Sequence, residues 1–225
     1  MPEPIPKKFT QDDIEKEIRI AETMEREINF SNKLIQEVNL SDRHLKVGVS
    51  FEKTKILGSA YFNKTIIEGN VNFKEATVQG TLYLGEGIIK GELNCQDLVI
   101  GEVLNLIGII VEKNLNLTGV KVKGFLSLNK INIKADLNAE KANIQDLKET
   151  AGNIKGGVYC EEAKIRGSAN FKEIVTEGVM DFQKTVIGGD LNLSNAQIKD
   201  FLILKDAIVL GEIKLDGLKC REKVS

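Results

Sequence analysis

The sequence is poor in the residues on which most catalytic and metal sites depend. Among its 225 residues there is no Trp, one His, three Cys and three Pro. The single histidine, His44, excludes a site built on two histidines and gives no support to a Ser–His or Cys–His catalytic pair. We therefore expect no catalytic residue, no bound metal and no cofactor.

Long apolar runs and an excess of one charge are missing as well. No stretch reaches the roughly 18 apolar residues of a membrane-spanning helix, and the opening sequence MPEPIPKKFTQDD has no apolar signal-peptide core. The 31 basic and 33 acidic residues leave a net charge of -2, which creates no long-range attraction for nucleic acid. We expect a cytoplasmic protein that binds neither membrane nor nucleic acid.

The chain does contain an eleven-residue repeat, which begins at Gln36 and ends near residue 221. One row of only ten residues, Asp146 to Lys155, interrupts it before the register resumes at Gly156. In the sixteen full rows, columns 3 and 5 are always apolar, and column 10 is apolar in fifteen. Column 8 is small or aliphatic in every row but the first. Ten rows begin with Gly, which suits a corner that needs a positive φ or a close backbone approach.

These column spacings predict an all-β fold. Columns 3 and 5 lie two residues apart, as do columns 8 and 10, so each pair points to one side of a short strand. Two rows, 22 residues, would close one four-sided coil, and residues 36–221 would form about eight coils of a β-solenoid. Residues 222–225 are interpreted as a tail. The ten-residue row lacks the apolar pair, which predicts a bulge or outward loop at 146–153.

The strand phrases resemble a known repeat family. They read VNLSD (38–42), VNFKE (71–75), LNLTG (115–119), ANFKE (169–173) and LNLSN (191–195). They are similar to the unit of the pentapeptide-repeat family, and column 4 carries Asn in eight of the sixteen full rows. The resemblance implies a right-handed, four-sided parallel β-helix. That family counts in fives, whereas this chain counts in elevens, so we expect different corners. A more distant similarity is to bactofilins, which are β-helices that form polymers.

Residues 1–35 are predicted to be a separate N-terminal segment with an amphipathic helix at about 10–27. Thr10 and Asp13 form a capping box, and apolar residues follow at helical spacing. Because the end of a β-helix exposes unpaired backbone and apolar core, the helix is expected to cover the first coil. A helix that dimerises or binds a partner is the alternative.

The cysteines are interpreted as reduced core residues. Cys95 and Cys160 occupy column 5 and Cys220 occupies column 10, all of which point inward. Cys95 and Cys160 are expected on the same side of the rod, three coils apart, which is too far for a disulfide. The adjacent Glu161 and Glu162 fall in a turn, and no column stacks acidic residues. The sequence therefore offers no carboxylate pair for sugar cleavage.

Two groups of outward apolar residues are candidate contact surfaces. The first is a stripe on consecutive coils, which the N-terminal helix would cover in a competing interpretation. It consists of Ile66, Ile88 and Ile110, with Tyr61 and Tyr83 nearby. The second lies on the last coils, and we expect it to form a homodimer or, with less support, a filament. It consists of Phe201, Ile203, Ile208 and Leu210.

Column 11 predicts a ladder of charges along one edge of the rod. In alternate rows the charges change sign for much of its length, which avoids like charges on neighbouring strands. The residues are Lys46, Glu68, Lys90, Glu112, Lys134, Lys155, Glu177 and Lys199.

Together these observations favour a non-enzymatic scaffold for protein interaction, whose partner the sequence does not name. A bactofilin-like polymer is the alternative. A carbohydrate-active enzyme would require clustered acidic side chains on one face. A DNA mimic that binds gyrase, as some pentapeptide-repeat proteins are, is disfavoured by the balanced charge.

Overall fold

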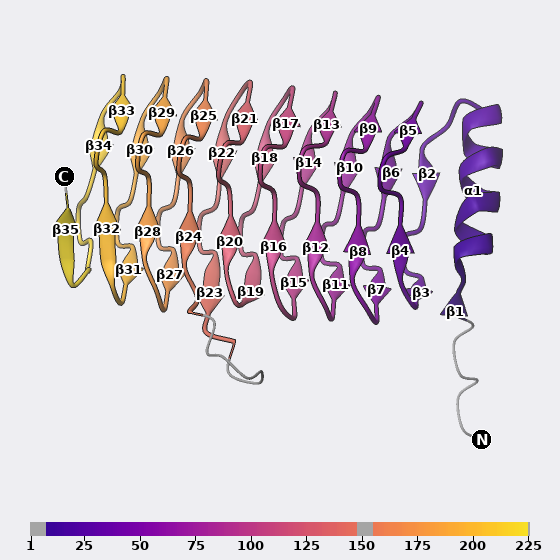
Figure 1. Ribbon diagram of the computed structural model, residues 1–225, viewed down its shortest axis with the longest axis horizontal. Coiled ribbons are helices and arrows are strands. Elements are labelled where there is room, and N and C mark those ends of the chain that lie inside the picture. The colour runs from indigo at the N-terminus through magenta and orange to yellow at the C-terminus, as the bar shows by residue number, and fades with distance from the viewer. Residues whose placement is uncertain (1–7, 148–154, 225) are drawn as a thin grey trace.

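The computed structural model describes residues 8–147 and 155–224, and these form a β-solenoid capped by one helix (Figure 1). Four parallel sheets, A to D, run the length of the rod. Successive strands of the chain fall in sheets C, D, B and A in turn, so each turn of the solenoid has four sides. Partners in a sheet usually lie two rows apart, as Leu82 and Leu104 do. The predicted four-sided parallel solenoid, in which two rows close each coil, is confirmed.

The strands are short, mostly two residues each. Sheet A contains β1 (Lys8–Phe9), β3 (Leu34–Ile35), β7 (Lys55–Ile56), β11 (Thr77–Val78), β15 (Val99–Ile100), β19 (Lys121–Lys123), β23 (Asn143–Gln145), β27 (Val175–Thr176) and β31 (Gln197–Ile198). Sheet B contains β2 (Ile28–Asn29), β6 (Val49–Ser50), β10 (Val71–Asn72), β14 (Leu93–Asn94), β18 (Leu115–Asn116), β22 (Leu137–Asn138), β26 (Ala169–Asn170), β30 (Leu191–Asn192) and β34 (Ile213–Lys214).

The other two sheets complete each turn. Sheet C contains β4 (Val38–Asn39), β8 (Ala60–Tyr61), β12 (Leu82–Tyr83), β16 (Leu104–Asn105), β20 (Leu126–Ser127), β24 (Val158–Tyr159), β28 (Met180–Asp181), β32 (Phe201–Ile203) and β35 (Glu222–Val224). Sheet D contains β5 (His44–Leu45), β9 (Ile66–Ile67), β13 (Ile88–Ile89), β17 (Ile110–Val111), β21 (Asn132–Ile133), β25 (Lys164–Ile165), β29 (Val186–Ile187) and β33 (Ile208–Val209).

The ladder extends beyond the expected limits of 36 and 221. β2 and β3 lie before residue 36 and pair with β6 and β7. At the other end, β35 pairs with β32 and so turns the expected tail into a strand. Three sheets therefore have nine strands, more than the eight coils expected. The eleven-residue repeat did not predict this earlier start, because Ile28 lies ten and not eleven residues before Val38, the next residue of column 3.

The interior is filled as the column pattern predicts. Residues of columns 3, 5, 8 and 10 are buried through most of the rod. Phe51 stacks on Phe30 at 5.0 Å and on Phe73 at 4.9 Å between ring centroids. Like side chains thus lie over one another at the strand spacing, which gives the core its continuity.

The corners depart from the expectation for glycine. Column 7, not the row start, has a positive φ in all sixteen full rows, for example 58° at Lys64. There the N–H of Thr65 donates to the carbonyl of Phe62 at 3.2 Å, which closes a tight turn. Among the row-starting glycines, Gly124 alone has a positive φ (112°). At most of the others, a Cβ would come within 3.0 Å of neighbouring atoms, so close approach, the second of the two expected reasons, explains the glycine.

The ten-residue row is not a rung. Leu104 pairs with Leu126, two rows on, but Leu126 pairs with Val158, which lies farther along the chain by the length of the short row. The same excess occurs in all four sheets. The segment is therefore an insertion between two stacked rungs. Most of the loop predicted at 146–153 lies outside the described residues.

The N-terminal helix, α1 (Gln11–Thr23), lies across the first rung, as predicted (Figure 1). Its capping box between Thr10 and Asp13 is present, and Ile14, Ile18 and Ala21 are buried. The helix packs on β2 and β4, so it covers the end of the rod and not the stripe that begins at Ile66. Within the described residues, no helix is long and apolar enough to cross a membrane.

Candidate interaction surfaces

The residues of the predicted stripe form two stacks, one on sheet C and one on sheet D. Tyr61 and Tyr83 are register partners, and their rings stack 5.2 Å apart with 7° between their planes. Ile66, Ile88 and Ile110 are register partners on successive strands of sheet D. All five side chains are half-buried, because each covers part of its neighbour. The structure therefore stacks the two tyrosines on each other and the three isoleucines on one another, as expected.

The second predicted group is more exposed. Ile208 is 53% and Leu210 74% exposed at the last strand of sheet D. Phe201 and Ile203 on β32 are half-buried, and the guanidinium of Arg221 lies 5.3 Å from the Phe201 ring centroid. The most exposed part of this group is therefore the Ile208–Leu210 edge.

A further apolar residue of the last rung was missed from the sequence. Ile213 on β34 occupies column 3, which points inward, yet it is 43% exposed. Ile28, in the equivalent column of the first strand of sheet B, is fully buried beneath α1. Leu204, Val209, Leu215 and Leu218 of the last rung are also only partly buried. A residue in an inward column is buried only where another rung or the helix covers it. The column position of Ile213 therefore could not predict its exposure.

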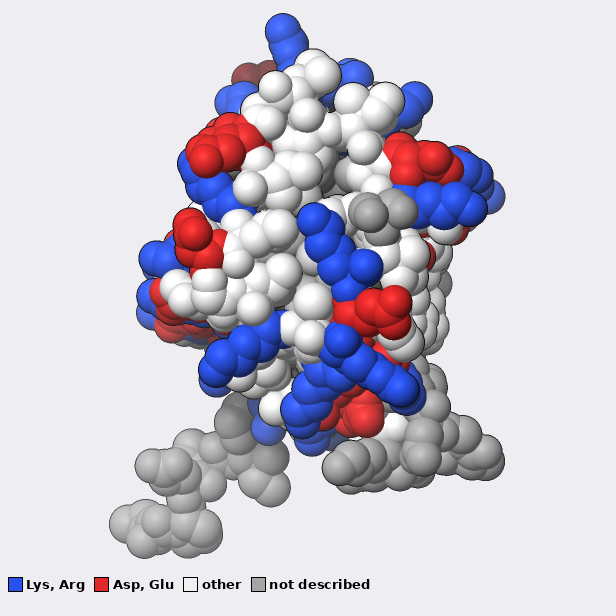
Figure 2. Space-filling view, turned by 90° about the vertical axis from the view of Figure 1, so that its left-hand side faces the viewer, with Lys and Arg blue, Asp and Glu red and all other residues white. Residues whose placement is uncertain are grey.

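Figure 2 views this end of the rod and shows uncharged surface in the upper part and left of centre, with charged side chains at the centre, below it and at the sides. Among the described strands, β33, β34 and β35 end their sheets and each pairs with one neighbour only. Such edge strands present backbone donors and acceptors to a partner. The last rung therefore combines apolar side chains with strand edges, and we name it the distal rung, residues 201–224.

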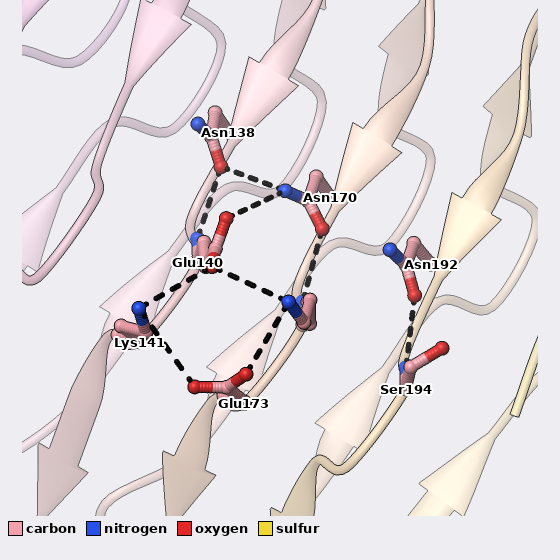
Figure 3. A network of polar contacts seen from close by, with 8 residues as sticks. Asn138, Glu140, Lys141, Asn170, Glu173, Asn192 and Ser194 are labelled. Carbon is pink, nitrogen blue, oxygen red and sulfur yellow. Dashed lines mark hydrogen bonds and ion pairs between the residues drawn. The ribbon is translucent and has the colours of Figure 1, made fainter. Parts of the chain in front are cut away.

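The outside of sheet B is held by a polar ladder (Figure 3). The side-chain amide of Asn170 donates a hydrogen bond to Oδ1 of Asn138 at 3.1 Å. Each asparagine Oδ1 also accepts a hydrogen bond from the backbone N–H two residues later; Lys172 N–H, for example, donates to Asn170 Oδ1 at 3.1 Å. Lys172 and Lys141 pair with Glu140 and Glu173 at 3.4–3.9 Å. These groups satisfy one another, so the ladder explains the asparagines of column 4 as turn and rung contacts.

Two predictions fail because the ten-residue row is an insertion. Arg166, not Lys155, follows Lys134 in the column 11 ladder, since Ile133 pairs with Ile165. The alternation of charge therefore stops at Lys134. Likewise, Cys95 follows a strand of sheet B and Cys160 a strand of sheet C, so they do not lie on the same side.

The side chains with chemical reactivity are isolated from one another. Cys95 and Cys160 are buried and free, and burial raises the pKa of both thiols. Cys220 is half-buried. Glu162 faces Lys130 at 4.0 Å. Within residues 8–147 and 155–224, no three His, Cys, Asp or Glu side chains are grouped to hold a metal ion.

Comparison with known proteins adds no assignment: no family model, curated protein or solved structure matches the chain. Function is therefore argued from the surfaces of this structure.

Proposed function

We propose that the protein is a non-enzymatic interaction scaffold of the pentapeptide-repeat type, and that its distal rung binds a second copy to form a two-fold dimer. The observation that carries the proposal is the exposure of Ile208, Leu210 and Ile213 on one rung. Burying such apolar surface contributes about 25 cal/mol per Å², which favours association. A two-fold contact also sets the edge strands of one copy against those of the other.

The charge around the distal rung supports self-association. Lys and Arg alternate there with Asp and Glu, so the margin suits a copy of itself better than a strongly charged partner. The basic residues are Lys205, Lys214, Lys219, Arg221 and Lys223, and the acidic ones are Asp206, Glu212, Asp216 and Glu222. Because one end of a rod offers little area, we expect a weak dimer with a Kd of roughly micromolar order.

Sedimentation velocity over a range of protein concentrations tests the dimer. We expect the wild-type chain to pass from monomer to dimer, and Ile213→Lys to remain monomeric because it places a charge in the contact. Val99→Lys is the matched control, since Val99 is 38% exposed in the middle of sheet A and should not alter association. A wild-type chain that stays monomeric throughout, or a control that is equally impaired, would contradict the proposal.

A bactofilin-like polymer remains the second candidate because α1 also exposes apolar residues. Met24 is 67% and Ile20 36% exposed on the helix. A head-to-tail contact between α1 and the distal rung would repeat without closing. Met24→Glu separates the two arrangements: it would abolish filaments seen by electron microscopy but leave a two-fold dimer intact.

A further inference from the structure

Several charges on the outside of the rod are paired across rungs, where oppositely charged side chains stack at the turns. Lys53 lies 3.8 Å from Glu75, and Lys64 lies 4.0 Å from Glu86. Lys141 lies 3.9 Å from Glu173. Each exposed pair contributes little stability, but it places opposite charges next to each other at the strand spacing.

Sheet D contains an exception, which we name the cationic cluster: Lys134, Lys164 and Arg166. Lys134 follows β21 and Arg166 follows β25 at equivalent positions, so two cations stack on adjacent rungs. Lys164 precedes Arg166 by two residues and shares its outward side. All three are exposed, and none forms an ion pair with any residue that the structure describes. Like charges at this spacing repel, so an anion bound between them would relieve that repulsion.

The cationic cluster lines a hollow of about 500 Å³. Gly188 lies next to Arg166 in column 11, and its missing side chain leaves space where other rungs carry long side chains. Val186 lines the same hollow and is 37% exposed. The hollow therefore offers cations on one side and apolar surface on the other.

A second hollow of about 400 Å³ adjoins the first through Lys164 and Asn132. Lys130 and Lys184 contribute two further cations there, and Glu162 is its one acidic lining residue. Ile110, at the end of the aliphatic stripe, lines it as well. Positive charge and apolar surface thus continue from the cluster toward the stripe.

We propose that the cationic cluster binds an acidic segment of a partner polypeptide, with carboxylates at Lys134, Lys164 and Arg166 and an apolar side chain beside Val186 and Gly188. The proposal rests on the scaffold function above and names the chemistry of one partner. The three cations lie outside the distal rung, but Leu210 of that rung lines the same hollow, so the two proposed contacts adjoin.

A polypeptide fits this surface better than a nucleic acid. Nucleic-acid binding depends on many phosphate contacts, roughly six to ten for a typical duplex-binding protein. Here Glu112 precedes Lys134 in column 11 and Glu162 lines the second hollow, so acidic residues bound the cluster within a few rungs. The apolar lining at Val186 also suits a side chain and not a phosphate.

Fluorescence anisotropy with labelled probes tests the proposal on the full chain. The probes are a peptide of alternating Glu and Leu, the same peptide with Gln in place of Glu, and a single-stranded oligonucleotide of equal length. We expect the Glu–Leu peptide to bind the wild type most tightly, and the double variant Lys134→Glu with Arg166→Glu to weaken it at least roughly tenfold. Added salt should weaken binding, because the contacts are exposed.

The matched control reverses two exposed cations on the opposite face, Lys121→Glu with Lys123→Glu on β19 of sheet A. It changes the net charge equally and should leave peptide binding within roughly twofold. The proposal is overturned if the control loses as much affinity, if the peptide does not bind, or if the oligonucleotide binds more tightly. Ile213→Lys should bind the peptide like the wild type. Loss of the dimer in that variant and loss of peptide binding in the double variant therefore test the two proposals independently.

Discussion

Gly101 lies against the backbone of Gln79 in the preceding rung. A Cβ built on Gly101 would stand 1.9 Å from the carbonyl oxygen of Gln79 and 2.7 Å from its carbonyl carbon. The contact is at the corner between sheets A and C, where the chain turns from β15 into β16. Since both atoms belong to the backbone, a neighbouring side chain cannot move aside to make room.

Replacing Gly101 by Ala should therefore destabilise the rod. Forcing a methyl group into this contact is expected to cost about 1–3 kcal/mol, the usual range for overpacking. Urea unfolding, followed by circular dichroism, measures the change. Lys123→Ala is the control because Lys123 occupies the equivalent position on the next strand of sheet A but is exposed. Equal unfolding midpoints for the two variants would contradict the argument.

The stacked phenylalanines make a second prediction. Phe51 is fully buried between Phe30 and Phe73, and Phe62 meets it edge-on at 5.5 Å between centroids. Phe51→Ala should lower the free energy of unfolding by about 3–5 kcal/mol, because rungs on both sides lose contacts and cannot collapse into the gap.

Phe201→Ala removes the same side chain from a half-buried position and is the comparison. It should cost clearly less than Phe51→Ala, since no cavity forms inside the rod. The same urea experiment decides the order, and a larger loss for Phe201→Ala would contradict the assignment of the core.

Much of this fold could be predicted from the sequence because one physical rule generates it. Residues two apart on a strand share a side, so Val71 and Phe73 were correctly predicted to face inward. The positive φ of column 7 was not predicted, because Lys64 and Glu75 adopt it as Gly108 does. The sequence feature that marks the positive φ of column 7 is the lack of larger apolar residues there, and not an excess of glycine.

The candidate sites were harder to predict than the fold. The pairing of Tyr61 with Tyr83 follows directly from the stacking of alternate rows. The stacking of Arg166 on Lys134 depends on whether residues 146–155 form part of a rung. Because this segment of ten residues is nearly as long as a row of eleven, the sequence did not show that it is an insertion. The exposure of Ile213 depends on what covers its layer, which its column does not encode.

Thiol reactivity tests the placement of the cysteines. Cys95 and Cys160 are fully buried, and burial raises the pKa of their thiols, so the reactive thiolate is scarce in the folded protein. Cys220 is half-buried in the distal rung. We expect a thiol reagent to modify Cys220 alone in the native monomer and all three cysteines in urea. The Cys220→Ser variant should be unreactive until it unfolds, and rapid native labelling of that variant would contradict the placement.

The last prediction concerns Asp190, which forms hydrogen bonds with residues of the distal rung. Its Oδ2 accepts a hydrogen bond from Lys214 at 2.8 Å, and its Oδ1 accepts one from the Glu212 N–H at 2.9 Å. The bond from Lys214 is the main cause that lowers the pKa of Asp190, and the backbone bond from Glu212 adds to it. The same contact raises the pKa of Lys214.

A lowered carboxyl pKa fixes the direction of the pH dependence. The stabilisation of the distal rung by Asp190 is fully present above the ordinary aspartate pKa, about 3.9, and is lost as the pH falls through the lower pKa of the folded state. Lys214→Met should raise the pKa of Asp190, as measured by carboxyl NMR titration. Lys219→Met removes another cation of the same rung that does not touch Asp190, so it should shift that pKa much less. Equal shifts in the two variants would show that general charge, and not the hydrogen bond from Lys214, sets the titration of Asp190.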